Sequence, residues 1–250
     1  MSTALQTSGL GKSFGGFKAN SDISLSVAQG ARHALIGPNG AGKTTFINLL
    51  TGVLPPTSGT IRLHGEDITR ISQQGRVRRG MARTYQINQL FPELTPIETI
   101  SLAIAERQGS GARFWSPVGA DSAVIDEAEA LLVQMQLGAF LTRATNTMPY
   151  GKQRLLEIAL ALACKPKLLL LDEPAAGVPE DERHDVLDSV AALPKDVTVL
   201  LIEHDMELVF AFADRISVLV QGALFAEGPV EEISTDPRVK AVYLGEDAHV

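Results

Sequence analysis

A glycine-rich run near the start of the chain carries residue types that bind phosphate. It matches the pattern G-x-x-x-x-G-K-[ST] at every specified position and reads Gly37, Pro38, Asn39, Gly40, Ala41, Gly42, Lys43, Thr44 and Thr45. Glycines let backbone N–H groups converge on an anion, and the helix that follows presents the positive end of its dipole. In this pattern the lysine reaches the β- and γ-phosphates of a nucleotide, and the hydroxyl of Thr44 ligates Mg²⁺. The run predicts a nucleotide site; the alternative is a glycine-rich turn without a ligand.

A second group of residues suited to this chemistry comes much later in the chain. Four leucines, residues 168–171, precede Asp172, Glu173 and Pro174. An all-apolar run is typical of a strand buried on both faces, and the carboxyl ends of such strands form the ligand edge of a parallel sheet. Asp172 is therefore placed to hold Mg²⁺, and Glu173 to orient or deprotonate an attacking water. The alternative is an acidic strand end without a ligand.

The neighbouring residues predict elements that position these groups. Ala34 to Ile36 is a short apolar run before the glycines, and an apolar helix follows them and closes near Gly52. The interval between Lys43 and Asp172 exceeds the roughly 30 residues of one βαβ unit, so it contains an insertion. That insertion has helical signals: a capping box at Thr95–Glu98 and an amphipathic run from about 121 to 136.

Composition narrows the class of protein. The chain has 250 residues, 45% of them hydrophobic, which is enough for a large core. One cysteine excludes an internal disulfide, and neither a signal peptide nor an apolar run of about 18 residues is present, so we expect a cytosolic protein. A net charge of −7 argues against a nucleic-acid-binding face. A basic cluster at Arg76, Arg78, Arg79 and Arg83 is interpreted as a solvated face in preference to a contact site.

The order of motifs resembles the ATP-binding subunit of an ABC transporter over nearly the whole chain. After the glycine-rich run come Gln86, a turn at Met148–Lys152, the leucine strand with its acidic end, and a strand leading to His204. Several segments are closer to the branched-chain (hydrophobic) amino-acid uptake ATPases, namely residues 82–86, 90–95, 172–177, 202–206 and 236–245.

The resemblance implies a fold and a division of the chain. The fold is an α/β P-loop NTPase core with a mostly parallel sheet, an N-terminal antiparallel β subdomain and an inserted helical subdomain. The whole chain, 1–250, forms a single ATP-binding domain. Its core comprises 1–86 and 164–250, and the helical lobe comprises about 87–163. In the core, Leu5–Phe14 and Ile23–Val27 suggest the antiparallel part, and 216–228 reads as a hairpin that turns near Gly222.

The resemblance also implies a role for each matching residue. Phe14 matches the aromatic residue that stacks on adenine, although a core phenylalanine is the alternative interpretation. Glu173 matches the general base, and His204 matches the residue that contacts the γ-phosphate and braces that base. Gln86 matches the glutamine that reaches Mg²⁺ and water, while Thr44 and Asp172 match the other Mg²⁺ groups. The signature turn matches Pro149, Tyr150, Gly151 and Lys152.

The partners and location follow from the same resemblance. ATP with Mg²⁺ would be hydrolysed to ADP and phosphate, and the energy would drive an importer of branched-chain or other amino acids. A second ATP-binding subunit, identical or related, completes each site with its signature turn. Integral membrane permease subunits hold the chain at the inner face of the cell membrane, and a solute-binding protein acts indirectly. No nucleic-acid partner is expected.

The sequence departs from the family pattern at two prolines. Pro149 stands where a serine normally offers a hydroxyl to the γ-phosphate of the partner's nucleotide, and proline supplies neither that hydroxyl nor an N–H. Pro179 stands where Asp or Asn is usual. These departures keep open an ABC subunit with weak hydrolysis in a heterodimer. The phosphate-binding motif by itself also fits a soluble ABC ATPase that acts outside transport, or a P-loop kinase.

Overall fold

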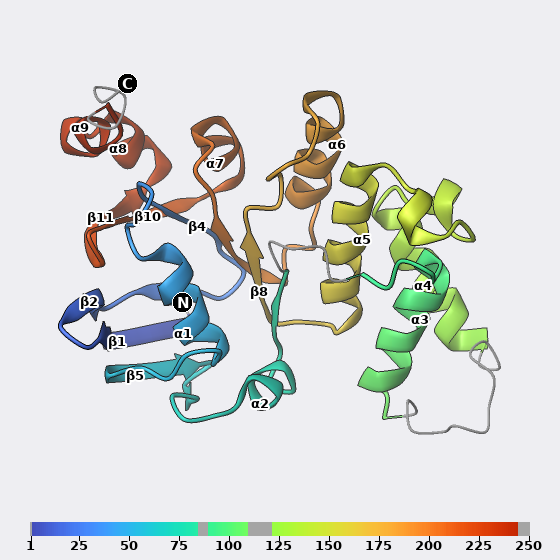
Figure 1. Cartoon of the computed structure of the whole chain (residues 1–250), viewed down its shortest axis with the longest axis horizontal. Helices are drawn as coiled ribbons and strands as arrows, with labels where there is room; N and C mark the ends of the chain where they lie inside the picture. Colours follow the sequence, from blue (N-terminus) through green and yellow to red (C-terminus); the bar gives the residue numbers. More distant parts are fainter. Residues whose placement is uncertain (1, 85–89, 110–121, 245–250) are drawn as a thin grey trace. The chain divides into compact units, whose positions relative to one another are not determined.

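The computed structural model describes residues 2–84, 90–109 and 122–244. It divides into two compact units (Figure 1). The first comprises residues 1–81, 167–173 and 194–250, and the second comprises 82–166 and 174–193. The single domain and the boundaries expected from the sequence stay predictions.

The first unit contains an antiparallel sheet built from the N-terminal residues. Its order is β2-β1-β5-β6, and β3 also pairs with β1. The strands are β1 (Thr3–Phe14), β2 (Phe17–Ile23), β3 (Ser26–Ala28), β5 (Ser58–Leu63) and β6 (Glu66–Asp67). The expected strand at Ile23–Val27 was wrong in its bounds, since β2 ends at Ile23 and β3 begins at Ser26. The C-terminal part of β1 pairs with β2, and its N-terminal part pairs with β3. The chain therefore forms two short strands here and not one.

A six-stranded sheet carries the residues expected to do chemistry. Its order is β11-β10-β4-β9-β8-β7. The strands are β4 (Arg32–Ile36), β7 (Met81–Arg83), β8 (Leu168–Asp172), β9 (Thr198–Ile202), β10 (Arg215–Val220) and β11 (Ala223–Pro229). The neighbours from β10 to β8 are parallel, whereas β11 returns antiparallel to β10 through the expected hairpin. The carboxyl ends of β4, β9 and β8 therefore lie at one edge.

Helix α1 (Lys43–Thr51) follows β4 and packs its apolar face into the core of the first unit (Figure 1). Phe46, Leu49 and Leu50 have no exposed surface and belong to one cluster with Leu170 of β8 and Leu200 of β9. Burying one such side chain contributes about 2 kcal/mol. The remaining helices of this unit are α2 (Gln73–Val77), α7 (Met206–Phe212), α8 (Val230–Thr235) and α9 (Pro237–Leu244).

The cluster of arginines at residues 76–83 contains a buried member. The sequence had suggested that this cluster is a solvated face. The Arg76 side chain is 2% exposed, and its Nη1 donates to the carbonyl oxygens of Leu49 and Leu50 at 2.6 and 2.5 Å. Its Nε and Nη2 donate to the carbonyls of Ile71 and Thr69, both at 3.0 Å. Carbonyls in the last turn of a helix lack partners four residues further on. Arg76 donates to two of them in α1, and the Leu49 carbonyl also accepts the Gly52 N–H. The interpretation as a solvated face was thus wrong for Arg76.

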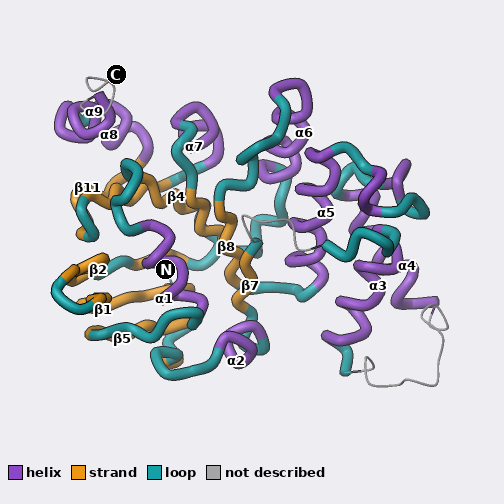
Figure 2. Tube along the Cα trace, viewed as in Figure 1, coloured by secondary structure: helices purple, strands orange, loops and turns teal. Residues whose placement is uncertain are grey.

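The second unit is mainly helical (Figure 2). Its α-helices are α3 (Pro96–Arg107), α4 (Ser122–Gln134), α5 (Tyr150–Ala163) and α6 (Glu180–Ala191). The capping box is confirmed: the Glu98 N–H donates to Thr95 Oγ1, and the Thr95 N–H donates to Glu98 Oε2 at 2.8 Å. In α3, α4 and α5, which lie side by side in Figure 1, Ile100, Leu132 and Leu155 have no exposed surface.

None of the helices within 2–84, 90–109 and 122–244 combines the length and the apolar character that crossing a membrane requires.

Candidate nucleotide-binding site

The glycine-rich run forms the loop between β4 and α1. Gly40 and Gly42 have φ values of 76° and 97°, which side-chain-bearing residues rarely adopt. At Gly42 a Cβ atom would lie 2.6 Å from the Ala19 carbonyl oxygen, so glycine is required by space as well as by conformation. Gly42 is also the N-cap of α1 and provides no side-chain hydrogen bond. A glycine N-cap leaves the first-turn N–H groups of α1 to other acceptors.

Two residues support this loop in a way that the sequence did not predict: Asn20 was not singled out, and Gly222 was expected only as the turn of a hairpin. The Asn20 Nδ2 atom donates to the Gly42 carbonyl at 3.2 Å, and the Gly222 N–H donates to the Ala41 carbonyl at 2.9 Å. Asn20 is in β2, and Gly222 is in the turn between β10 and β11. Both contacts join segments far apart in the chain, so no local pattern reveals them.

Lys43 opens α1 and turns its side chain back onto the loop. Its Nζ donates to the carbonyl oxygens of Gly37 and Pro38, the latter at 3.1 Å, and its side chain is largely buried. Thr44, Asn39 and Gly40 are exposed, whereas Gly37 is buried. A cation at a helix N-terminus, beside exposed hydroxyl and backbone groups, matches the chemistry of polyphosphate binding.

The acidic residues at the end of β8 differ in exposure and conformation. Asp172 is the last residue of the strand and is 6% exposed. Glu173 follows it with φ of 47°, in the left-handed region, and its N–H donates to the Ile202 carbonyl of β9 at 2.9 Å. A non-glycine residue in this region costs about 1–3 kcal/mol and is over-represented at functional sites. Because of this backbone conformation, the Glu173 side chain does not follow the alternation of side chains between the two faces of β8.

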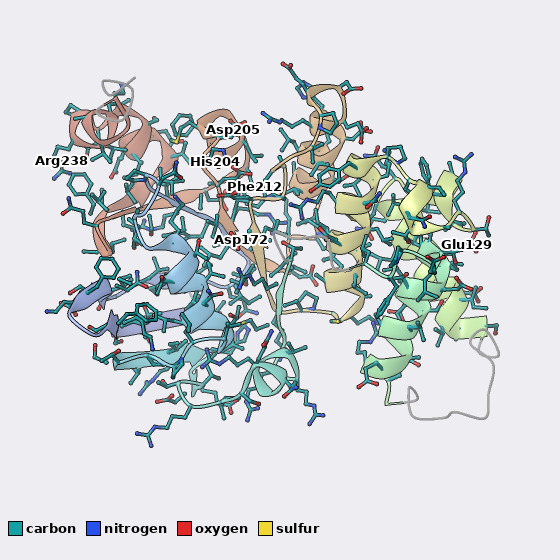
Figure 3. All side chains as sticks on the ribbon, in the orientation of Figure 1. Glu129, Asp172, His204, Asp205, Phe212 and Arg238 are labelled. Atoms are coloured by element: carbon teal, nitrogen blue, oxygen red, sulfur yellow. The ribbon has the colours of Figure 1, made fainter. Side chains whose placement is uncertain are left out.

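His204 follows β9 and lies beside two carboxylates. Its Nδ1 is 3.7 Å from Glu173 Oε1 and 3.6 Å from Glu203 Oε2. Figure 3 labels His204 and Asp172, which follow and end neighbouring strands. The imidazole is 63% exposed, so it is open to solvent on the side away from the carboxylates. Of the residues that the sequence singled out, Glu173 and His204 are thus brought together.

Glu203 is a further buried acid that the sequence reasoning did not assign. Its side chain is 2% exposed, and its Oε2 accepts the N–H groups of His204 at 2.9 Å and Asp205 at 3.3 Å. Burial raises the pKa of Glu203, although these two hydrogen bonds and His204 act in the opposite direction. The carboxylate thereby holds the turn that presents His204.

Phe14 ends β1 and is 48% exposed, which does not fit the alternative of a core phenylalanine. The Lys12 ammonium lies 5.2 Å from the centre of its ring. Gln86, the third residue expected to act in catalysis, lies outside the described residues.

The expected signature turn belongs to the second unit. Pro149 is the N-cap of α5 and makes no side-chain capping bond. The Gly151 N–H donates to Glu182 Oε2 at 2.6 Å, and Lys152 Nζ donates to Asp185 Oδ2 at 2.8 Å. Two of the donors expected to face a nucleotide thus contact carboxylates of α6.

The chain matches two family models. The model described as ABC transporter matches residues 20–176, and the model described as branched-chain amino acid ATP-binding cassette transporter matches 223–249. The first covers more than half of the chain, and the second covers the C-terminal segment whose resemblance was noted in the sequence.

Similar proteins cover almost the whole chain. The high-affinity branched-chain amino acid transport ATP-binding protein BraF of Pseudomonas aeruginosa is 40% identical over 97% of this chain and 98% of its own length. LivG of Escherichia coli, which has the same description, is 39% identical over the same shares.

A solved structure has the same fold. The ADP conformation of MJ1267, an ATP-binding cassette of an ABC transporter, has a TM-score of 0.85 and 32% identity and covers 98% of this chain and all of that one. These similarities confirm the fold class predicted from the motifs. The chain belongs to the ABC transporter family of ATP-binding proteins.

Proposed function

We propose that this chain is the ATP-hydrolysing subunit of an importer for branched-chain amino acids. The observation that carries the proposal is the pairing of Glu173 with His204 after β8 and β9, at the sheet edge where the phosphate loop follows β4. The names of BraF and LivG support the substrate class. The match over 223–249 supports it independently, since that segment lies outside the general ABC transporter match.

The phosphate loop and β1 bind the nucleotide in this proposal. The exposed ring of Phe14 stacks on adenine, and residues 37–45 hold the phosphates through backbone N–H groups. Lys43 exchanges its loop carbonyls for phosphate oxygens, which are stronger acceptors because they are charged.

Oxygen-bearing residues fit a Mg²⁺ ion. Thr44 provides a hydroxyl, Asp172 a carboxylate and Gln86 an amide oxygen, and hard divalent cations prefer such ligands. When bound, Mg²⁺ would neutralise charge on the phosphates.

In the proposed function, Glu173 and His204 perform the chemical step. Glu173 accepts a proton from water as the water oxygen attacks the γ-phosphorus, and the bond to the β-γ bridging oxygen breaks to give ADP and phosphate. His204 donates a hydrogen bond to the γ-phosphate and braces Glu173, with Gln86 orienting the water. Glu203 keeps the His204 turn in place through its hydrogen bonds to that turn's backbone.

The working assembly contains more than this chain. We propose that a second ATP-binding subunit provides its signature turn, corresponding to residues 149–152, to complete the site. Membrane permeases bind the helical lobe, about 87–163, and hold the chain at the inner face of the cell membrane. A solute-binding protein delivers the amino acid to those permeases. A related partner chain in a heterodimer is favoured by Pro149, which lacks the usual hydroxyl.

Sedimentation velocity tests the assembly. The Glu173→Gln variant is compared with and without ATP and Mg²⁺, alone and combined with Pro149→Ser. A dimer that forms with Pro149 in place supports a homodimer, whereas a dimer that needs Pro149→Ser indicates a different partner subunit. Absence of dimers in both, with ATP bound, contradicts closure of this turn on a nucleotide.

Uptake tests the transport role. Cells that carry Glu173→Gln in place of the parent chain are expected to lose ATP-dependent uptake of radiolabelled leucine, but to retain uptake of an unrelated solute. Unchanged leucine uptake would contradict the substrate class.

A further inference from the structure

The N-terminus of α5 is covered by acidic side chains of α6. Gly151 N–H and Lys152 Nζ, in the first turn of α5, donate to Glu182 and Asp185 respectively. These two acids are three residues apart on α6 and so lie on one face of that helix. Figure 1 shows α5 and α6 as neighbouring helices of the second unit.

Gly151 makes this contact possible. A Cβ atom at position 151 would lie 2.6 Å from Glu182 Oε2 and 2.9 Å from its Cβ. The glycine lies in the first turn of a regular helix, and the close approach of Glu182 accounts for the absence of a side chain. Because Pro149 provides no side-chain cap, Glu182 takes the capping position from a neighbouring helix.

A carboxylate and a phosphate compete for the same donors. Both are anions that a helix N-terminus and an ammonium group attract, and one N–H cannot donate fully to both. On the proposed function, on which this inference rests, these donors meet the nucleotide of the partner subunit. We propose that Glu182 and Asp185 form an internal latch on the signature turn, which the nucleotide phosphate must displace before two subunits can close.

The contacts of the latch are weak enough for a nucleotide to displace them. The Asp185 side chain is 50% exposed and that of Lys152 is 18% exposed, so water reaches the ion pair from the Asp185 side and weakens it. Glu182 lies in the first turn of α6 together with Glu180 and Asp181. A carboxylate released from α5 therefore stays near the positive end of its own helix dipole. The latch raises the ATP and protein concentrations needed for dimers without blocking them.

The test is ATP-driven dimerisation of the full chain in the Glu173→Gln background, followed by sedimentation velocity across protein concentrations. Glu182→Gln removes the charge but keeps an oxygen acceptor for Gly151, and Glu182→Ala removes both. Asp185→Asn tests the second contact of the latch, between Asp185 and Lys152. Glu180→Gln, which removes the same charge from the same turn, is the matched control.

Release of one charge-assisted hydrogen bond corresponds to roughly a tenfold change in an equilibrium constant. We expect Glu182→Gln and Glu182→Ala to form dimers at about tenfold lower protein concentration than Glu180→Gln. Equal or weaker dimerisation would overturn the latch and leave Glu182 as a cap of α5.

Two controls separate failure of the latch from failure of the proposed function. Thermal melting of each variant verifies that it is folded. ATP titration of the monomer measures the affinity of the phosphate loop for ATP without a contribution from dimer formation. ATP binding without dimers in every variant, both with Pro149 in place and with Pro149→Ser, would overturn the latch. Absence of ATP binding would overturn the proposed function itself.

Discussion

Glu173 Oε1 and His204 Nδ1 lie 3.7 Å apart across the ends of two neighbouring parallel strands. Glu173 reaches this position through a left-handed backbone conformation, and His204 is held by the buried Glu203. The pair is the least ordinary feature of the candidate site, because Glu173 has a strained backbone and the turn that carries His204 is held by the buried carboxylate of Glu203.

Glu173→Gln should slow ATP hydrolysis by about 10²–10⁴-fold, because an amide cannot accept the proton of the attacking water. ATP affinity should change little, since the variant has a side chain of the same shape. Phosphate release and isothermal titration measure the two quantities. The control is Glu231→Gln, at an exposed position of α8. Hydrolysis at the parent rate would exclude Glu173 as the general base.

Lys43→Ala should weaken ATP binding by about 10–100-fold, the size of one charge-assisted hydrogen bond. Lys195→Ala, which removes the same charge from the exposed surface, should bind ATP as the parent does. Calorimetry measures both affinities. Since Lys43 also donates to Pro38, the variant is checked by thermal melting. Retained affinity in a folded variant would contradict the phosphate role.

Arg76→Met should lower the free energy of unfolding by about 3 kcal/mol, because four carbonyl oxygens lose a buried donor. Methionine keeps most of the packed volume. Urea denaturation measures the change, with Arg78→Met at an exposed position as the control. An equal effect of the two substitutions would show that these four hydrogen bonds add no stability.

His33 should make stability depend on pH. It is 1% exposed in β4, its Nε2 lies 2.8 Å from Ser217 Oγ, and no described residue hydrogen-bonds its Nδ1. Burial lowers its pKa to about 4, against 6.5 unperturbed. The unfolded chain therefore takes up a proton below about pH 6.5 that the folded chain refuses until about pH 4.

The His33 contribution to stability is present above pH 6.5 and is lost as the pH falls towards 4. Between pH 7 and 5 we expect the parent to lose about 2 kcal/mol more than His33→Gln does. Urea denaturation at both pH values gives the comparison. His184→Gln, at an exposed position, should retain the parent's pH dependence. Equal pH dependence in parent and His33→Gln would show that the buried imidazole is not responsible.

Local features were predictable from the sequence. The capping box at Thr95–Glu98 and the helix after the phosphate loop depend on residues three or four apart, and both are present. The leucine strand and its acidic end were predictable for the same reason. Strands with weak alternation were harder to place, and β5 was missed because most of its residues are exposed.

The sequence by itself pointed to the family, which the similar proteins confirm, and it predicts a nucleotide site and the residues that would form it, because those motifs are short and chemically specific. Only the tertiary structure decided the burial of Arg76, the short distance between Glu173 and His204, and the hydrogen bond from Gly151 to Glu182. The contacts of Arg76 with α1, of Glu173 with His204 and of Gly151 with Glu182 join residues 26 to 31 positions apart. The free energy of such contacts depends on how helices and strands pack together, and no local spacing in the chain records that packing.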